Sequence, residues 1–446
     1  MLTPLEPWIH AKLALPASTT LTRDALDDYQ LGRLQATIAY ARSHSPFYRH
    51  HLAGTDAAEL RCLGDISTLP FTTPADIMEN DLRFLCVSQS GIERVVTLNS
   101  SGTTNKAKRL HFTAPDLELT VDFFRHGMGT LVTSGQRVLI LMPGELPGSV
   151  GDLLVQGLAR MGATGFIHGI VRDEAVAIAE IVAREIDCIV GLPVQVLALA
   201  RHAAAAAIPV GRIKSVLLSA DYVPAVVVQE IERMWGCPVF NHYGMTEMGL
   251  GGAVECRTRS GCHIREADLY VEIIHPVTGL PLPDGELGEL VFTTLTRSGM
   301  PLIRYRSGDL SRFIPEPCPC GTVLKRLDRV RGRLAGIVQL AGENPVSMAD
   351  LDEALFPLPG LINFRAVVSE ENGRDVLHVT ILTGGGPAEK LCSSARQALS
   401  SIPVLQKALA GGRLAIAPLA IDIENNWLNS GSIKRTLYDH REELTC

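Results

Sequence analysis

The sequence predicts an α/β protein: a large N-terminal domain with parallel sheets flanked by helices and a β-rich subdomain, followed by a small mobile α+β C-terminal domain. Three observations lead to this prediction. Apolar strands alternate with helices from 138 to 241, strands and turns dominate 263–327, and a charged, glycine-containing stretch at 329–333 is typical of a hinge. We therefore place the domains at 1–332 and 333–446.

The parallel sheet is predicted from short apolar runs, each bounded by turn residues or a helix. We expect its strands at 138–142, 188–190, 215–218 and 239–241. We expect helices at 26–42, 149–161, 175–185, 194–206 and 224–235, with the alanine run at 203–207 extending the fourth. The C-terminal domain should hold strands near 337–340, 364–369 and 375–382 and helices at 348–355 and 388–402. Because ligands of such sheets bind at the carboxyl ends of strands, we expect the binding residues on the loops that follow strands.

Bulk composition narrows the class of protein. The chain has 446 residues, which suggests two or three domains, and its 46% hydrophobic and 20% charged residues are typical of globular proteins. A net charge of -7 gives no basic field for nucleic acid. No signal peptide and no run of about 18 apolar residues is evident, so we expect no membrane partner and a cytoplasmic protein.

The strongest local signal is the polar stretch S-S-G-T-T-N-K-A-K at 100–108. Hydroxyls and backbone amides in a glycine-containing turn form a nest for anionic oxygens, and lysines add positive charge. This pattern suits a nucleotide triphosphate, although the spacing is not that of a Walker loop. An ordinary polar loop is the alternative.

Two further motifs follow predicted strands. N-H-Y-G-M-T-E at 241–247 comes directly after a buried strand, and Glu247 there could bind magnesium, which prefers carboxylate and phosphate oxygens. R-Y-R-S-G-D at 304–309 ends in Asp309, a carboxylate that could accept two hydroxyl hydrogen bonds from a ribose. Alone, each also suits a solvated loop or a common turn.

Together and in this order, the three motifs resemble the phenylacetate–CoA ligase branch of the adenylate-forming superfamily. The segments S-P-F-Y at 45–48 and L-P-F-T-T at 69–73 also resemble that family, so the resemblance spans the chain from about residue 40 to its end. It implies that ATP activates a carboxylic acid, a small aryl or other organic acid, as an acyl-AMP. The acyl group would then pass to coenzyme A after the small domain rotates.

The resemblance also implies roles for individual residues. The triphosphate would be gripped by Ser100, Ser101, Gly102, Thr103, Thr104, Lys106 and Lys108. Tyr243 would flank the adenine, Thr246 would contact the α-phosphate, Glu247 would bind Mg²⁺, and Asp309 would hold the ribose. The remaining nucleotide-binding positions are Ser219, Ala220, Asp221, His242, Gly244, Met245 and Arg333.

The chain departs from the family pattern in its C-terminal motif, which usually reads S-G-K-x-x-R. Here it reads S-G-S-I-K-R at 430–435, so Ser432 replaces the adenylation lysine, and Lys434 could take over that catalytic role. Two other readings therefore stay open. The acyl group could pass to an amine, a hydroxyl or a carrier protein, or the chain could be a nucleotide-binding homologue with weak ligase activity. A homodimer is also left open.

Four residues predict a structural zinc site. Cys256 and His263 form one pair, and Cys318 and Cys320 form a second pair about fifty residues further on. Structural zinc takes four thiolate or imidazole ligands in a tetrahedron, and two such pairs can close on one ion. Cys262 is the alternative fourth ligand because it adjoins His263. Ordinary buried thiols are the competing interpretation.

Overall fold

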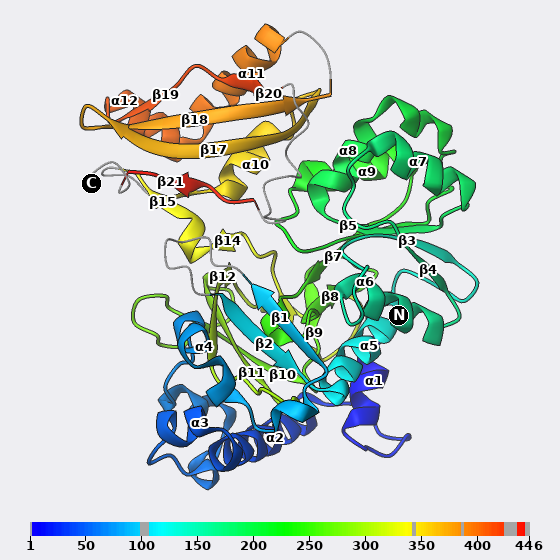
Figure 1. Cartoon of the computed structure of the whole chain (residues 1–446), viewed down its shortest axis with the longest axis vertical. Helices are drawn as coiled ribbons and strands as arrows, with labels where there is room; N and C mark the ends of the chain where they lie inside the picture. Colours follow the sequence, from blue (N-terminus) through cyan, green and yellow to red (C-terminus); the bar gives the residue numbers. More distant parts are fainter. Residues whose placement is uncertain (1, 99–106, 341–344, 385–387, 423–434, 442–446) are drawn as a thin grey trace. The chain divides into compact units, whose positions relative to one another are not determined.

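The computed structural model describes residues 2–98, 107–340, 345–384, 388–422 and 435–441 (Figure 1). They form two compact units, both discontinuous in sequence. The first unit contains 1–136, 143–165 and 240–330, and the second contains 137–142, 166–239 and 331–446. The predicted domain boundary between residues 332 and 333 stays a prediction.

The first unit begins with helices that the sequence starts in a recognisable way. Thr73 and Thr113 each cap the third following amide, at Asp76 and Asp116, and each aspartate caps the threonine amide in return. These reciprocal bonds satisfy backbone donors that a helix start leaves unpaired. The unit's helices are α1 (Leu5–Lys12), α2 (Arg23–His44), α3 (Pro46–His51), α4 (Pro74–Asn80), α5 (Ala114–Met128) and α6 (Val150–Arg160).

The strands of the first unit pair in antiparallel fashion. A hairpin joins β1 (Arg94–Leu98) to β2 (Lys108–Phe112). A second group follows the order β10–β11–β12, and a third follows β13–β9–β8–β7. The bounds are β7 (Val239–Tyr243), β8 (Ala253–Glu255), β9 (Cys262–Ile264), β10 (Leu269–Ile274), β11 (Gly288–Thr294), β12 (Tyr305–Ser311) and β13 (Arg326–Leu327).

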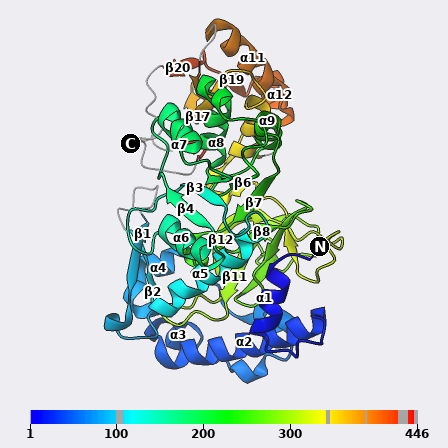
Figure 2. The same ribbon diagram turned by 90° about the vertical axis from the view of Figure 1, so that its right-hand side faces the viewer.

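Helix α2 lies beside the strands β10 and β11 in both views (Figures 1 and 2). Its polar side chains reach the backbone there: Gln30 donates to the Glu266 carbonyl at 2.8 Å, and Arg33 donates to the Leu295 carbonyl at 2.8 Å. Helices α5 and α6 pack closely because Gly157 lacks a side chain, and a Cβ there would lie 3.0 Å from the Arg125 amide. The hydrogen bonds from α2 hold the backbone that follows β9 and β11.

The second unit contains the predicted parallel sheet. Strands β3 (Arg137–Leu141), β5 (Cys188–Gly191) and β6 (Ser215–Leu218) pair in parallel and are almost completely buried, as expected of strands covered on both faces. The helices that follow are α7 (Glu174–Ala183), α8 (Pro193–Arg201) and α9 (Ala225–Trp235), and β4 (Thr164–Ile167) continues from the first unit into the second.

The C-terminal part of the second unit is built around the long antiparallel pair β17 and β18, at the top of Figure 1. Its strands are β14 (Gly332–Arg333), β15 (Ile337–Gln339), β16 (Pro345–Ser347), β17 (Leu361–Glu371), β18 (Arg374–Thr383), β19 (Leu414–Ile416), β20 (Ala420–Asp422) and β21 (Tyr438–Asp439). Its helices are α10 (Met348–Leu355), α11 (Ala388–Ser401) and α12 (Pro403–Ala410). One apolar core joins β15–β19 and α10–α12 to the helices α8 and α9.

The predicted elements are confirmed within a few residues of their bounds, with one exception. The alanine run does not extend α8, because α8 ends at Arg201 and His202 adopts an extended conformation. The His202 imidazole accepts a hydrogen bond from the Ala204 amide at 3.1 Å and so begins a separate 3-10 turn, η5 (Ala203–Ala207). The prediction of a continuous helix over 194–206 was therefore wrong.

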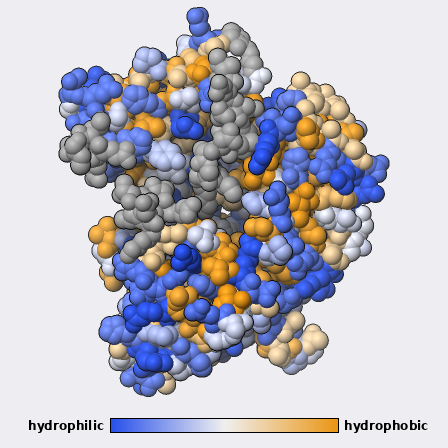
Figure 3. Space-filling model, in the orientation of Figure 1, coloured by the Kyte–Doolittle hydropathy of each residue, from blue (hydrophilic) through white to orange (hydrophobic). Residues whose placement is uncertain are grey.

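The surface mixes hydrophilic residues with small apolar patches, as Figure 3 shows for one face. Val95, on the β1–β2 hairpin, is one of the exposed apolar residues, with 47% of its surface accessible. Within the parts of the chain that the structure describes, no helix is both long and apolar enough to cross a membrane.

Candidate active site and metal centre

The β1–β2 hairpin carries the end of the predicted phosphate loop. Leu98 pairs with Lys108, so the strands bring the two ends of the connection together. Lys108 is the one loop lysine whose position is described. The other predicted loop residues lie outside the described residues: Ser100, Ser101, Gly102, Thr103, Thr104 and Lys106.

The Y-G-M-T-E motif forms a sharp turn between β7 and β8. Tyr243 ends β7, and Thr246 begins the one-turn 3-10 helix η6 (Thr246–Met248). A Cβ at Gly244 would lie 2.2 Å from the Leu250 carbonyl oxygen, so this position requires glycine. Leu250 itself has a φ of 66°, a left-handed conformation that a branched side chain rarely adopts. The turn is therefore tightly folded back on itself.

Glu247, on this turn, forms a buried polar cluster with two other side chains of the first unit. It is 4% exposed, and its carboxylate accepts a hydrogen bond from the Lys108 ammonium. The Tyr305 hydroxyl lies 3.3 Å from the same carboxylate oxygen and 3.1 Å from the Lys108 nitrogen. The structure thus brings together a residue from the phosphate loop and the predicted magnesium ligand.

Asp309 lies next to the turn through Tyr243. The Tyr243 hydroxyl donates to the Asp309 carboxylate at 2.9 Å, and the Asp309 amide donates to the Ser307 hydroxyl at 3.0 Å. Gly308, with a φ of 72°, donates its amide to Glu289 at 3.1 Å. Asp309 is 3% exposed, so its carboxylate is fixed by neighbours on β12 and β7.

A buried ion pair anchors the start of the third motif. Arg304 is 1% exposed and contacts the Glu272 carboxylate at 2.9 Å, while it also donates to the Leu69 carbonyl at 2.6 Å. Its φ of 47° is unusual for a side chain of this size. Leu69 and its neighbours belong to the L-P-F-T-T segment, so the two motifs are joined.

The predicted adenine segment belongs to the second unit. Ser219, Ala220 and Asp221 follow directly after β6, at the carboxyl end of a parallel strand. Ala220 has a φ of 72°, and the Asp221 carboxylate accepts the Tyr222 amide at 2.9 Å. Arg333 is also in this unit, on β14, and both Ser432 and Lys434 lie outside the described residues.

His242 and Met245 flank the site on the first unit. The His242 ring lies 6.0 Å from the ring of Phe123 and 6.3 Å from that of Phe124, both on α5. Burial and the nearby Arg265 charge lower the pKa of His242 to about 4, so the imidazole is neutral near pH 7. Met245 is buried directly before η6.

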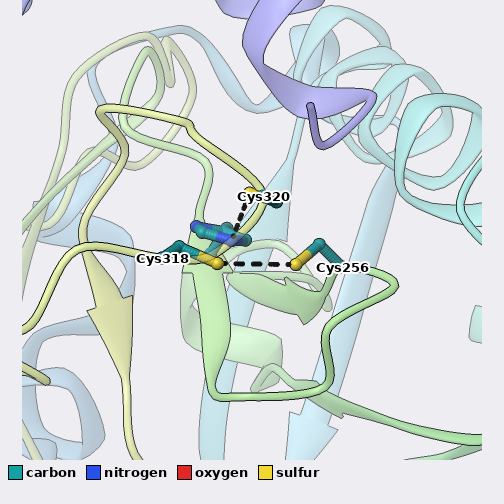
Figure 4. Close-up of side chains that lie close together, drawn as sticks. Cys256, Cys318 and Cys320 are labelled. Carbon is teal, nitrogen blue, oxygen red and sulfur yellow. Dashed lines mark hydrogen bonds between the residues drawn. The ribbon is translucent and has the colours of Figure 1, made fainter. Parts of the chain in front are cut away.

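The four predicted zinc ligands lie together. The ligand atoms of Cys256, His263, Cys318 and Cys320 are all within 4.8 Å of one another, and all four residues are buried. Figure 4 shows the two cysteines of the C-P-C segment facing Cys256 and the imidazole. Pairing of β9 with β8 and β13 explains this meeting, because it sets the turn after β8 against the loop before β13.

Two separations within the cluster match tetrahedral zinc. The sulfurs of Cys256 and Cys318 are 3.7 Å apart, and the Cys320 sulfur lies 3.6 Å from His263 Nε2. Zn–S bonds of about 2.3 Å at a tetrahedral angle place two sulfurs about 3.8 Å apart, whereas a disulfide requires about 2.05 Å. Burial lowers the pKa of His263 to about 4, which leaves the neutral imidazole that metals require.

The alternative ligand Cys262 lies elsewhere. Its thiol is directed to the Asn241 carbonyl, 3.5 Å away, and it is absent from the group of four. Adjacent residues of a strand point to opposite faces, so His263 on β9 faces the cluster and Cys262 does not.

Sequence reasoning missed Tyr305, although a signal was present. Along β12 the buried residues alternate, which sets Tyr305, Ser307 and Asp309 on one face. The strand that carries the predicted ribose ligand therefore also presents a tyrosine to the predicted magnesium ligand.

Known proteins resemble this chain in sequence and fold. Residues 93–296 match the family of AMP-binding enzymes. A phenylacetate-coenzyme A ligase of Pseudomonas putida is 31% identical over 368 residues, which cover 79% of this chain and 81% of the relative. The phenylacetate-coenzyme A ligase of Escherichia coli K12 is 30% identical over 380 residues, with 81% and 83% covered.

A solved structure resembles the fold of the whole chain. It is a 2-hydroxyisobutyryl-CoA ligase in the postadenylation state in complex with R3-HIB-AMP, with a TM-score of 0.77 and 22% identity. The alignment covers 96% of this chain and 94% of that one. This likeness extends the predicted α/β architecture to both units.

Proposed function

This chain belongs to the phenylacetate–coenzyme A ligase family, and we propose that its substrate is a small aryl or other small organic acid. It is an AMP-forming acid–thiol ligase, which activates a carboxylic acid with ATP and then transfers the acyl group to coenzyme A. The cluster of Lys108, Glu247 and Tyr305 beside Asp309 is the observation that supports our assignment of the site.

The reaction needs ATP because a carboxylate has no usable leaving group. A carboxylate oxygen attacks the α-phosphorus of ATP, the bond from that phosphorus to the bridging oxygen breaks, and pyrophosphate leaves. The thiolate sulfur of coenzyme A then attacks the acyl carbon of the mixed anhydride, and AMP leaves. Both steps build negative charge on oxygen, so catalysis depends on positioning and charge stabilisation.

We assign the charges of the first unit to this chemistry. Glu247 would hold Mg²⁺, which would neutralise charge on the triphosphate as pyrophosphate leaves. Lys108, whose ammonium is paired with the Glu247 carboxylate, would add positive charge near the triphosphate oxygens. Asp309 would accept the ribose hydroxyls, with Tyr243 orienting its carboxylate and lying against the adenine. Thr246 would contact the α-phosphate.

We also propose a structural zinc ion held by Cys256, His263, Cys318 and Cys320. The ion would tie the β8–β9 turn to the loop before β13. It would stabilise the fold below the nucleotide turn and take no part in the reaction.

The proposed substrate class is tested by ATP–pyrophosphate exchange with a series of aryl and short aliphatic acids. We expect exchange that depends on one group of these acids, and product formation that depends on coenzyme A. Product formation with an amine or a carrier protein and without coenzyme A would instead support acyl transfer to another acceptor. No exchange with any acid would support the nucleotide-binding homologue.

Asp309→Ala is expected to weaken ATP binding by about 10–100-fold, because two hydrogen bonds to the ribose hydroxyls, each contributing roughly 0.7–1.5 kcal/mol, are lost. Calorimetry with ATP and Mg²⁺ measures the change. Arg312→Gln is the control, because the exposed Arg312 guanidinium bonds the half-buried Asp328 and the Gly285 carbonyl; this variant should bind ATP normally. Unchanged binding in Asp309→Ala would remove Asp309 from the ribose role.

Ser432→Lys is expected to raise the adenylation rate by about tenfold, because it restores a cation where negative charge develops. Pyrophosphate exchange at saturating ATP measures this rate. If Lys434 already serves, Lys434→Ala is the damaging change and Ser432→Lys has no effect. A rate that neither substitution alters would exclude this segment from adenylation.

A further inference from the structure

The backbone of the turn that carries Glu247 is held by three side chains from distant parts of the first unit. Arg297 donates to the Glu247 carbonyl at 2.8 Å, Arg265 donates to the Met248 carbonyl, and the Thr120 hydroxyl donates to the Gly249 carbonyl at 2.9 Å. These carbonyls lie at the end of the one-turn helix η6, and that of Gly249 also accepts the Gly251 amide at 2.8 Å. The position of the turn is thus set by residues that follow β9 and β11 and by α5.

Arg297 differs from Arg265 and Thr120 because it also bonds a second segment of the backbone. Its Nη1 binds the Glu247 carbonyl, and its Nη2 donates to the His111 carbonyl at 2.9 Å. His111 is on β2, the strand that begins with Lys108. One planar guanidinium therefore connects the strand that carries Lys108 to the turn that carries Glu247, and its rigid fork fixes their separation.

The surroundings of Arg297 hold it in one position. It is 7% exposed and lies over the Phe112 ring at 4.2 Å. Asp116 fixes the loop that carries it, accepting the Ser298 amide at 2.8 Å and the Gly299 amide at 3.0 Å. A Cβ at Gly299 would lie 2.6 Å from that carboxylate, so the loop can approach only with glycine there.

Stability alone would not favour such a side chain at this place. A buried guanidinium loses its hydration, and apolar side chains of similar volume stabilise a core as well or better. Burial lowers the pKa of Arg297 to about 10, so it still carries its charge near pH 7. An apolar residue could not form hydrogen bonds to two backbone segments at once.

We propose that Arg297 is a positioning residue of the ATP site, which sets the separation of the Lys108 ammonium and the Glu247 carboxylate. It acts through the two backbone carbonyls and does not contact substrate. The proposal rests on the proposed role of Glu247 in holding Mg²⁺. A separation that is wrong by a fraction of an ångström would weaken the joint binding of metal and triphosphate more than the binding of ATP alone.

The test compares Arg297→Lys with Arg33→Lys. Lysine keeps the charge but has one nitrogen, which cannot bond both carbonyls in the geometry of the fork. Arg33 is the matched control because it also donates to a carbonyl of the same connection, that of Leu295, yet contacts neither β2 nor the turn. Calorimetry with ATP is performed in Mg²⁺ and in chelator, and thermal unfolding and pyrophosphate exchange are measured on the same samples.

We expect Arg297→Lys to reduce the factor by which Mg²⁺ tightens ATP binding by about fivefold or more, with the KM for the acid nearly unchanged. Arg33→Lys should leave that factor as in the wild type. An unchanged factor in Arg297→Lys, with only a lower unfolding temperature, would overturn the proposal and make Arg297 a stabilising residue. Wild-type protein without Mg²⁺-dependent binding or exchange would instead contradict the proposed function itself.

Thr120→Val gives a second test should the arginine variant fail to fold. It removes the hydrogen bond to Gly249 from the same turn without changing a charge. We expect a reduction of the same factor by about threefold, and an unchanged factor would show that the carbonyls of this turn do not control the site.

Discussion

Glu247→Gln is expected to lower ATP–pyrophosphate exchange by about 10²–10³-fold, because a carboxylate that holds charge-neutralising Mg²⁺ is replaced by a neutral amide. Binding of ATP measured in chelator should change far less. The reason lies in the geometry of the cluster. Glu247 is buried. The Lys108 ammonium compensates its charge at short range, and the Tyr305 hydroxyl orients its carboxylate. The substitution keeps the shape of the side chain and removes this one charge.

Two variants make the interpretation specific. Glu247→Asp retains the charge on a shorter side chain and should recover part of the exchange rate. Glu118→Gln, on the solvent side of α5, loses only an exposed ion pair with Arg160 and should exchange at the wild-type rate. Near-normal exchange in Glu247→Gln would exclude the carboxylate from metal binding and leave Lys108 as the main charge at this position.

Much of the fold could be predicted because its signals are local. Each strand of the parallel sheet is a short apolar run, and the helices between these strands are bounded by turn residues. The one failed element, the continuous helix over 194–206, also had a local cause. Alanine favours a helix, but the capping imidazole of His202 offered the backbone another partner.

The residues of the site also differ in whether a local sequence signal marks them. Lys108, Glu247 and Asp309 could be named from motifs, since each sits within a run of characteristic neighbours. Arg265 and Arg297 could not, because they bond backbone carbonyls 17 and 50 residues away and leave no periodic pattern in their own segments. Only strand pairing and the packing of α5 bring these arginines next to the backbone carbonyls that they bond.

Removal of zinc is expected to have the second large effect. Protein purified without added metal should contain about one zinc ion per chain. Cys318→Ser should lose that ion and lower the free energy of unfolding by about 4 kcal/mol, because binding to a site that exists only in the folded chain stabilises the fold. The affected region is poor in other support: the apolar cluster around the site consists of Cys256, Cys318 and Cys320 alone among the described residues.

The thiols of this centre differ in how readily they ionise: burial raises the pKa of Cys320 to about 12, whereas that of Cys318 is lowered. Burial opposes ionisation of the Cys318 thiol, but hydrogen bonds with Thr258 and its cysteine neighbours outweigh burial and bring its pKa below the usual value. Zinc binds cysteine as the thiolate and histidine as the neutral imidazole, and His263 is neutral. The sulfurs of Cys256 and Cys318 lie 3.7 Å apart, and as two thiolates they would repel one another unless a cation joined them.

Cys262→Ser is the matched control, because Cys262 is as buried as the four proposed ligands and adjoins His263. Its thiol bonds the Asn241 carbonyl, so its loss should leave the zinc content at one equivalent. Plasma emission spectroscopy measures the metal, and denaturant unfolding with and without chelator measures the stability. Full zinc in Cys318→Ser together with loss in Cys262→Ser would move the fourth ligand to Cys262. Zinc well below one equivalent in the wild type, with stability unchanged by chelator, would leave four ordinary buried side chains.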